Sequence, residues 1–501
     1  MKKWTRFGLV KIFSILVFML FIQNGIAQNT LELTLNQAVE IAMKNSYRIK
    51  QLKLGIERTR QWLKAERAGL KTKIYMNLKA PEIQVMSEYK WNSDLHRDEV
   101  VKRNTRLWQM DFSIRQPVIL FGYPTNGYLS PNNKIYRYMQ KNENNDITYY
   151  NRYFIKFEQP FFQPNRLKND IERAELDLEE NELEYLTNIV DIIEWTADDY
   201  YDVFRFSYLN IIYSNHVANL ERVEKIVETI VKNDTSRSIE KNQVEVELAN
   251  AREILLQNMS NLRLEVARMK QRLGLNSSDT LSVSTEINIK PVYVDLERAL
   301  EYGYNLRPQL RLLANRRRQN EITLENVKGS NAFRVDLEVT YGIEKQDDDY
   351  RYLWEESDNS YSITLNAYIP LWDWGQRKAR IEAQKITLKK TDLWIEETKR
   401  NIESEITNAV ENLEEFQQRT INMKRNMEMA KEITLKSINQ YRDGKISLQD
   451  LLQTINRQKE TEINFLNVYI DYRRSLLNLM IDTYYDFEND VKLFDQFRVT
   501  S

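Results

Sequence analysis

The chain has 501 residues, with 72 Lys and Arg against 73 Asp and Glu. It therefore lacks the surplus of positive charge that a nucleic-acid-binding surface needs. Only 12 glycines and 9 prolines occur, and 29% of the residues are charged, a composition typical of long helices. The absence of cysteine excludes disulfides, thiolate metal sites and a cysteine nucleophile.

The N-terminal segment 1–27 has the pattern of a secretory signal peptide. A positively charged start precedes the apolar run 12–22, and small residues at 25–27 resemble a cleavage site. The apolar run is too short to cross a membrane comfortably, so an uncleaved anchor is the weaker alternative. We expect the mature protein to be exported.

The first clear strand follows much later in the chain. Residues 147–157 alternate between two faces, as β-strands do. One face carries Tyr149, Tyr153, Ile155 and Phe157, and the other carries Thr148, Arg152, Lys156 and Glu158. The strand is about as long as a tilted membrane strand and is expected to stop at Pro160.

A very long helix is predicted after Asn165. The run that follows has no glycine or proline and would give a helix of roughly 100 Å at 1.5 Å per residue. Apolar or small residues recur every seven positions, which predicts a coiled-coil seam. These are Leu176, Leu183, Val190, Ala197, Phe204, Ile211 and Ala218. A polar break at 232–237 and a return helix over 238–273 complete a hairpin.

The same unit recurs in the second half of the chain. Two alternating segments, 333–343 and 361–369, lead through Pro370 and Gly375 into a second long helix. Its heptad seam is Trp374, Ile381, Leu388, Ile395, Ile402, Ala409, Phe416, Met423 and Ala430. The second core position holds Ile406, Leu413 and Met427 and is interrupted by Thr420 and Thr434. A break at 442–445 precedes a return helix over about 447–487.

The fold class that follows is mainly α with membrane β-strands, in a duplicated arrangement of strands and long helices. A few strands cannot close a barrel, and an open sheet edge cannot lie in lipid. Membrane strands here would therefore have to form a barrel shared between subunits. The alternative is a soluble periplasmic coiled-coil scaffold or adaptor, whose strands would form an ordinary sandwich.

Four motifs, in order, resemble the TolC-like family of outer-membrane efflux proteins. The first is Leu-Thr-Leu-Asn-Gln-Ala-Val-Glu-Ile-Ala-Met-Lys-Asn at 33–45, and its echo lies at 296–310. The others are Ile-Pro-Leu-Trp-Asp-Trp-Gly at 369–375, and Tyr-Arg-Asp-Gly-Lys-Ile-Ser-Leu-Gln-Asp-Leu-Leu at 441–452. The resemblance covers nearly the whole mature chain.

The resemblance implies a homotrimer with an α-helical tunnel through the periplasm and a shared β-barrel in the outer membrane. The protein would be the passive exit duct of a tripartite efflux or type I secretion system. Its expected partners are a periplasmic adaptor (membrane fusion) protein, an inner-membrane pump and outer-membrane lipid. The resemblance implies neither an enzyme nor a cofactor.

The family closes its tunnel with acidic residues on the second return helix. Carried over by position, the first acid is Asp450, and the second position holds Gln453. Tyr441, before the tip glycine Gly444, matches a tyrosine that latches the closed tip. Where the first repeat of the family often has an acid, this chain has Lys241 nearby. We therefore expect one acidic ring and a rearranged latch.

The predicted domain organisation follows the duplication. A first repeat spans 28–290, a second spans 291–488, and 489–501 forms a tail. The hairpins are expected at about 165–273 and 374–487, and the second pair of barrel strands at about 333–371. Pro160, Pro370 and Gly375 mark the junctions between strands and helices.

The first repeat contains additional material at 92–146. The family needs two strands per repeat, and this region could supply four before Phe162. An extra hairpin would keep the parity of the sheet, and its location is left open between the barrel mouth and the equatorial region.

Motifs for other functions are missing from the sequence. The two histidines, His96 and His216, lie far apart and have no metal-site spacing. There is no P-loop, dinucleotide fingerprint or nucleophile elbow. No catalytic or metal-binding residue is therefore predicted.

Overall fold

The computed structural model describes residues 30–141, 146–276 and 278–493. The predicted signal peptide lies outside these residues. The chain divides into two compact units, and the long helices cross from one to the other. The first unit contains residues up to Leu52, Glu184–Pro308, and the chain from Thr398 onward. The second contains Lys53–Leu183 and Gln309–Glu397.

The predicted duplication is visible in the lengths of the helices. The 11 residues of α2 (Leu35–Asn45) and the 22 of α3 (Tyr47–Ala68) are matched by the 11 of α6 (Leu296–Leu306) and the 22 of α7 (Pro308–Gly329). The first hairpin consists of α4 (Arg166–Asn233, 68 residues) and α5 (Ser238–Leu273, 36 residues). The second consists of α8 (Gln376–Arg442, 67 residues) and α9 (Leu448–Thr483, 36 residues). Each sequence feature that sets a helix boundary therefore occurs twice at nearly the same spacing.

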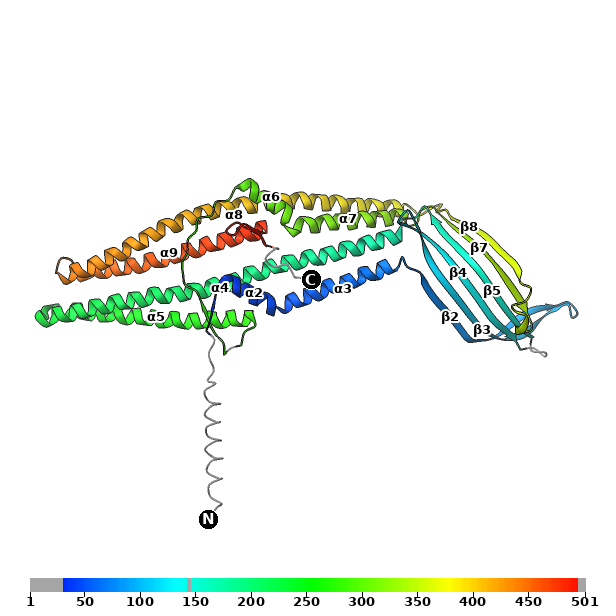
Figure 1. Cartoon of the computed structure of the whole chain (residues 1–501), viewed down its shortest axis with the longest axis horizontal. Helices are drawn as coiled ribbons and strands as arrows, with labels where there is room; N and C mark the ends of the chain where they lie inside the picture. Colours follow the sequence, from blue (N-terminus) through cyan, green and yellow to red (C-terminus); the bar gives the residue numbers. More distant parts are fainter. Residues whose placement is uncertain (1–29, 142–145, 277, 494–501) are drawn as a thin grey trace, which may run out of the picture. The chain divides into compact units, whose positions relative to one another are not determined.

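The second unit contains one antiparallel sheet of six strands (Figure 1). Its spatial order is β2–β3–β4–β5–β7–β8. The strands are β2 (Lys73–Asn92), β3 (Arg97–Leu120), β4 (Tyr123–Gln140), β5 (Asp146–Phe161), β7 (Arg334–Asp347) and β8 (Asp358–Tyr368). Four strands thus precede Phe162, where the family pattern has two. The extra segment left unplaced by the sequence lies mainly in β3 and β4 of this same sheet.

The register of the sheet separates its side chains into an apolar and a polar face. The apolar face includes Ile74, Met76, Leu78, Met110, Phe112, Leu129, Ile155, Phe157, Val339, Tyr341, Ile363 and Leu365. Many of these are exposed; Ile363 is 73% exposed. On the polar face, Lys156 contacts Glu158 at 2.7 Å and Glu338 at 3.0 Å. Nothing in the described part of this unit covers the apolar face as the second sheet of a sandwich would.

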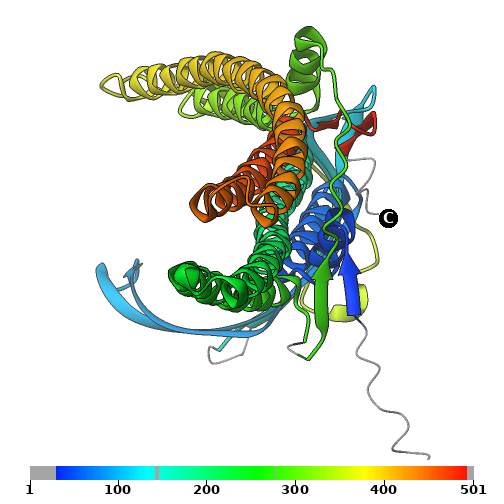
Figure 2. The same cartoon turned by 90° about the vertical axis from the view of Figure 1, so that its left-hand side faces the viewer.

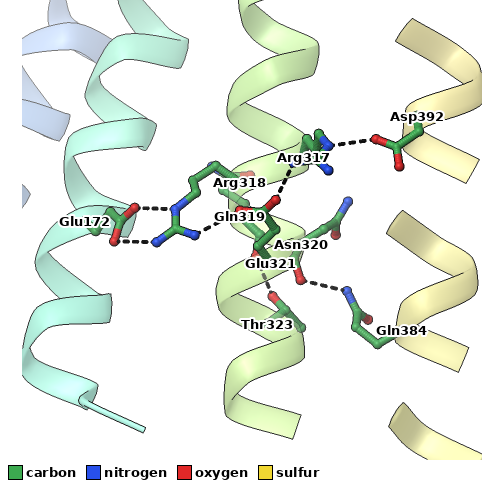
Figure 3. Close-up of polar contacts among 9 residues, drawn as sticks. All are labelled: Glu172, Arg317, Arg318, Gln319, Asn320, Glu321, Thr323, Gln384 and Asp392. Carbon is green, nitrogen blue, oxygen red and sulfur yellow. Dashed lines mark hydrogen bonds and ion pairs between the residues drawn. The ribbon is translucent and has the colours of Figure 1, made fainter. Parts of the chain in front are cut away.

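Ion pairs connect the helical segments of the second unit (Figure 3). Arg318 of α7 binds Glu172 of α4 through two hydrogen bonds of 2.5 and 3.1 Å. The neighbouring Arg317 reaches in the other direction and donates to Asp392 of α8 at 2.7 Å. The side chain of Gln384 donates to the Asn320 carbonyl at 3.2 Å. A planar guanidinium suits such two-point contacts, so α7 lies between α4 and α8 in a fixed rotation.

The junctions between strands and helices differ slightly from the predicted positions. Pro160 is still paired, opposite Asp336, and β5 ends one residue later at Phe161. Pro370 lies just after β8, so the strand is shorter than the predicted segment ending at 371. Gly375 has φ +78°, which favours glycine, and Trp374 also has positive φ (56°). Trp374 therefore lies before the start of α8. The heptad pattern, which placed Trp374 first in the seam of this helix, was wrong at this position.

The first unit has its core where the two hairpins pack. Phe204 of α4 contacts Tyr469 of α9, and the Thr420 hydroxyl of α8 donates to the Val468 carbonyl at 3.2 Å. The most deeply buried row of α8 is the second core position of the heptads. It consists of Ile406, Leu413, Thr420, Met427, Thr434 and Tyr441. The two threonines therefore lie in the seam, where their hydroxyls bond to carbonyls of the preceding turn.

The predicted seam of α4 is correct only in part. Val190, Ala197 and Phe204 are buried, but Ile211 is 43% exposed and Ala218 is also exposed. Beyond Phe204 the buried row continues through Ile212, His216, Leu220, Val223 and Val227. A helix with 3.6 residues per turn drifts by about 20° per heptad against a strict seven-residue repeat. The strict repeat therefore leaves the buried face after a few heptads.

Smaller elements complete the first unit. The strands β1 (Thr30–Leu33) and β6 (Thr280–Val283) pair in parallel and lie side by side in Figure 2. Helix α9 ends at Thr483, earlier than the predicted 487, because Tyr484 takes a left-handed conformation with φ 56°. The chain then forms β9 (Tyr485–Asp486) and β10 (Val491–Lys492), and the Tyr485 ring stacks on Tyr302. Among the described residues, no helix has both the length and the apolarity needed to cross a membrane.

Replacing Ile406 by alanine should destabilise the first unit. The side chain is fully buried, and truncating such a residue costs about 2–5 kcal/mol through lost burial and a residual cavity. Thermal unfolding of the purified protein should shift to lower temperature. Ile421→Ala on the same helix, where the side chain is 40% exposed, is the matched control and should shift unfolding much less.

Candidate gate at the helical tips

The turn of the second hairpin is built around Gly444. Its φ is +72°, its N–H donates to the Tyr441 carbonyl at 2.9 Å, and the N–H of Lys445 donates to the Gln440 carbonyl at 2.8 Å. These two bonds form a Schellman motif, which ends a helix and satisfies its last carbonyls. Gly444 therefore fixes where α8 stops, and with it the place of Tyr441 in the last turn.

The turn of the first hairpin contains the short helix η1 (Thr235–Arg237). Asp234 caps it by accepting hydrogen bonds from the backbone N–H of Ser236 at 3.1 Å and from the Ser236 hydroxyl at 2.6 Å. Helix α5 begins immediately afterwards at Ser238. This geometry brings Arg237 and Glu240, three residues apart, onto the same side of the first helical turn.

Three side chains connect the two hairpin tips. The Tyr441 hydroxyl donates to Oε2 of Glu240 at 2.6 Å, and the Tyr441 side chain is only 1% exposed. The guanidinium of Arg237 donates to both oxygens of Glu240 at 2.8 Å and lies 5.8 Å from the centre of the Tyr441 ring. We call Tyr441, Glu240 and Arg237 the tip latch. The hydrogen bond from Tyr441 to Glu240 joins the two hairpin ends.

The tip latch lies on the end of an apolar core. Residues from α4, α5, α8 and α9 form this core, and most of them are aliphatic. They are Val217, Leu220, Val223, Val227, Val244, Leu248, Ala251, Ile438, Tyr441, Leu448, Leu451 and Ile455. Tyr441 belongs to both the core and the latch. Its ring contributes apolar burial, and its hydroxyl needs a partner because it is taken out of water.

The latch changes the pKa of its members. Burial and the hydrogen bond to Glu240 both raise the pKa of Tyr441, which stays protonated and keeps its donor. Burial by itself would raise the pKa of Glu240, but hydrogen bonds from Arg237 and Tyr441 outweigh it and hold that pKa below its usual value. A carboxylate with a lowered pKa stabilises the fold above its unfolded-state pKa, and this contribution is lost as the pH falls through the folded value.

The predicted gate acid Asp450 lies in the first turn of α9. Its carboxylate accepts from the Ser447 hydroxyl at 2.6 Å, and its backbone N–H donates to Ser447 Oγ at 3.1 Å. The two residues form a capping box, and Asp450 is exposed. Gln453 is one turn further on and lines a groove between α5 and α9 with residues such as Asn242 and Leu452. Asp450 and Gln453 are therefore not part of the tip latch.

Two residues of the latch were not predicted from the sequence. The predicted position nearby was Lys241, whose ammonium lies 3.6 Å from Glu245 and 3.9 Å from Glu228. The partner of Tyr441 is the preceding residue, Glu240, together with Arg237. The signal that could have identified them is the Arg-x-x-Glu spacing at the start of a helix, where both side chains meet.

No alternative chemical site was found in the part of the chain that the structure describes. No three His, Asp or Glu side chains among these residues gather as metal ligands would. His216 is 7% exposed within α4, and burial followed by the nearby charge of Lys459 lowers its pKa to about 4. It is therefore a neutral core histidine at physiological pH.

Comparisons with known proteins bear on this arrangement. Residues 294–481 match the family model described as outer membrane efflux protein. Among solved structures, the chain is similar to the Campylobacter jejuni CmeC outer membrane channel, with 14% identity, a TM-score of 0.64, and coverage of 93% of this chain and 89% of that one. It is also similar to VceC from Vibrio cholerae, with 12% identity, a TM-score of 0.63, and coverage of 90% and 95%. No curated protein matches the sequence.

At 12–14% identity these structures establish the fold. It is the fold that these two outer-membrane proteins share. The match to the outer membrane efflux protein model falls on the second repeat and covers less than half of the chain.

Replacing Tyr441 by phenylalanine should loosen the tips of the hairpins. The ring remains, and Glu240 keeps Arg237 as a donor but loses the Tyr441 hydroxyl; a hydrogen bond to a charged group contributes about 1.5–3 kcal/mol. Amide hydrogen exchange of 235–250 and 438–450 should become faster. The control is Tyr208→Phe, since the Tyr208 hydroxyl forms no hydrogen bond with any described residue. Unchanged exchange at both tips would show that the latch holds nothing in place.

Proposed function

We propose that three copies of this chain assemble into an exit duct that crosses the outer membrane and extends into the periplasm. In this assembly the six-stranded sheet lies in the membrane and the helical hairpins form the wall of a tunnel. A periplasmic adaptor protein and an inner-membrane pump would dock at the hairpin tips and supply the energy. The duct itself would be passive and would serve a tripartite efflux or type I secretion system.

The observation that carries this proposal is the amphipathic character of the sheet. One face is apolar and exposed, with Leu365 65% and Ile363 73% exposed, and the opposite face carries ion-paired charges. An exposed apolar surface of this extent is typical of a membrane or an interface. A soluble scaffold would cover that face with a second sheet, so the same observation argues against the alternative function.

We further propose that the tips form the periplasmic gate and that the tip latch holds it closed. Breaking the Tyr441–Glu240 bond would free the second hairpin from the first. Asp450 would act differently, as a ring of three exposed carboxylates around the pore axis. Like charges brought together repel one another and attract cations, so such a ring would favour cations at the entrance. Pro160, Pro370 and Gly375 would redirect each subunit from membrane strands to tunnel helices.

Native mass spectrometry of the protein extracted from outer membranes tests the assembly. We expect a trimer that stays in solution only in detergent, because the apolar face of the sheet must remain covered. The same sample diluted below the critical micelle concentration should aggregate. A monomer or dimer recovered from the periplasmic fraction without detergent would contradict the duct.

Asp450→Asn tests the proposed ring of charge separately from the helix cap. Asparagine keeps an acceptor for the Ser447 hydroxyl but removes the negative charge, so the stability of α9 should change little. In planar bilayers the trimer should lose cation selectivity. Asp443→Asn, in the same turn but outside the capping box, is the charge-matched control. If both variants lost cation selectivity equally, the selectivity would depend on net charge at the tip and not on Asp450 itself.

A further inference from the structure

The six-stranded sheet has two edges that no strand covers in the described part of the chain. One is β2 and the other is β8. Because the sheet has an even number of antiparallel strands, β2 and β8 run in opposite directions. The β8 edge of one copy can therefore pair with the β2 edge of the next as an antiparallel ladder. In lipid, both edges must be paired.

The register shows how far each copy is offset from the next. One row of paired residues crosses the whole sheet: Tyr75, Ser113, Asn132, Phe154, Gly342 and Ser360. Tyr75 lies two residues from Lys73, where β2 begins, and Ser360 lies eight residues from Tyr368, where β8 ends. Both of these termini are on the helix side of the sheet. The separation between the row and the helix-side end of the strand thus grows from two residues in β2 to eight in β8, an increase of six residues across the six strands.

This offset is the one that a closed barrel needs. Suppose that the helix-side ends of β8 and of the neighbouring β2 are level. Each copy then contributes a stagger of about six residues over its six strands. The rise is about 3.3 Å per residue, and neighbouring strands are about 4.8 Å apart. The corresponding strand tilt is about 35°, within the range of roughly 35–45° in membrane barrels. Identical copies can therefore continue the ladder without a change of tilt.

We propose that three copies close an eighteen-stranded barrel, in which β8 of each subunit pairs with β2 of the next. This inference rests on the trimer proposed above and departs from the two strands per repeat of the family pattern. The added hairpin belongs to the wall because β4 pairs with β5 without interruption from Tyr128 to Gln140. Removing β2 and β3 from the wall would break the pairs between β3 and β4 as well.

The number of strands sets the width of the pore. At a tilt of about 35°, eighteen strands give a backbone-to-backbone diameter of roughly 34 Å, whereas twelve would give roughly 22 Å. The polar face would line this wider opening. Arg115 of β3 lies 3.3 Å from Glu158 of β5, on the far side of β4, and Arg152 of β5 lies 3.4 Å from Glu344 of the adjacent β7. Charges on this face are therefore paired between strands. A barrel of this size holds an aqueous channel.

Cysteine crosslinking tests the pairing of β8 with β2, since the natural chain has no cysteine. With the helix-side ends level, Thr364 of one copy faces Asn77 of the next, and both lie on the polar face. Cα atoms of antiparallel neighbours are 4.5–5.5 Å apart, which a disulfide can span. Oxidising the full-length Asn77→Cys/Thr364→Cys variant in outer membranes should give a covalent trimer on non-reducing gels, with dimer as an intermediate.

The control is Asn77→Cys/Thr340→Cys. Thr340 is also a threonine of the polar face, but it lies in β7 between two partners and should give no crosslinked species. The eighteen-stranded barrel would be overturned if Thr364→Cys crosslinked to Lys134→Cys of β4, which would place β4 at the subunit boundary. Crosslinking within one chain would overturn it too. Native mass spectrometry of the same samples reports the trimer independently, so the assembly and the strand number can fail separately.

Discussion

The hydrogen bonds at the edges of the six-stranded sheet constrain the whole molecule. Each strand between β2 and β8 has both its neighbours, but within the described residues no strand pairs with the outer edges of β2 and β8. In water such edges promote aggregation, and in lipid they cannot exist. The exposed apolar face raises the same problem for side chains. A closed barrel of identical copies in a membrane solves both problems, because it pairs the strand edges and covers the apolar face with lipid. Membrane insertion therefore requires assembly of the subunits.

The long helices obey a different constraint. In the 68-residue helix α4 the apolar residues do not stay on one face over the whole length. The buried face shifts around the helix because it must remain in contact with the neighbouring helices. In α4 the buried row leaves the strict heptad after Phe204, and in α8 it follows the second core position down to Tyr441. Thr420 and Thr434 fit that row because their hydroxyls bond within the helix or to the Val468 carbonyl. Threonine hydroxyls that form hydrogen bonds locally can be buried in the seam. The small threonine side chains then let the helices pack closely without large apolar residues at these positions.

In the tip latch, one buried core residue also joins the ends of the two hairpins. The heptad places the Tyr441 ring in the apolar core, and its hydroxyl reaches Glu240 at the start of the other hairpin. The Schellman turn at Gly444 fixes the end of α8, and Asp234 caps the short helix η1 that directly precedes the first return helix. Because both turns are held by local hydrogen bonds, the single hydrogen bond from Tyr441 to Glu240 depends directly on how far apart the two hairpin tips lie. Asp450 is fixed by its own capping box and remains free to contribute charge.

The sequence by itself determined the duplication, the hairpins and most of the strands, because these depend on local signals. Period-two alternation, uninterrupted helical runs, Gly444 and Ser447 act within a few residues, and the return helix at 238–273 was predicted with its observed bounds. Only the tertiary structure decided that β3 and β4 join the same sheet as β5, since strand pairing depends on partners far along the chain. It also decided that Glu240, and not Lys241, faces Tyr441. A one-residue step along a helix turns a side chain by about 100°, and packing between hairpins selects which residue meets the tyrosine.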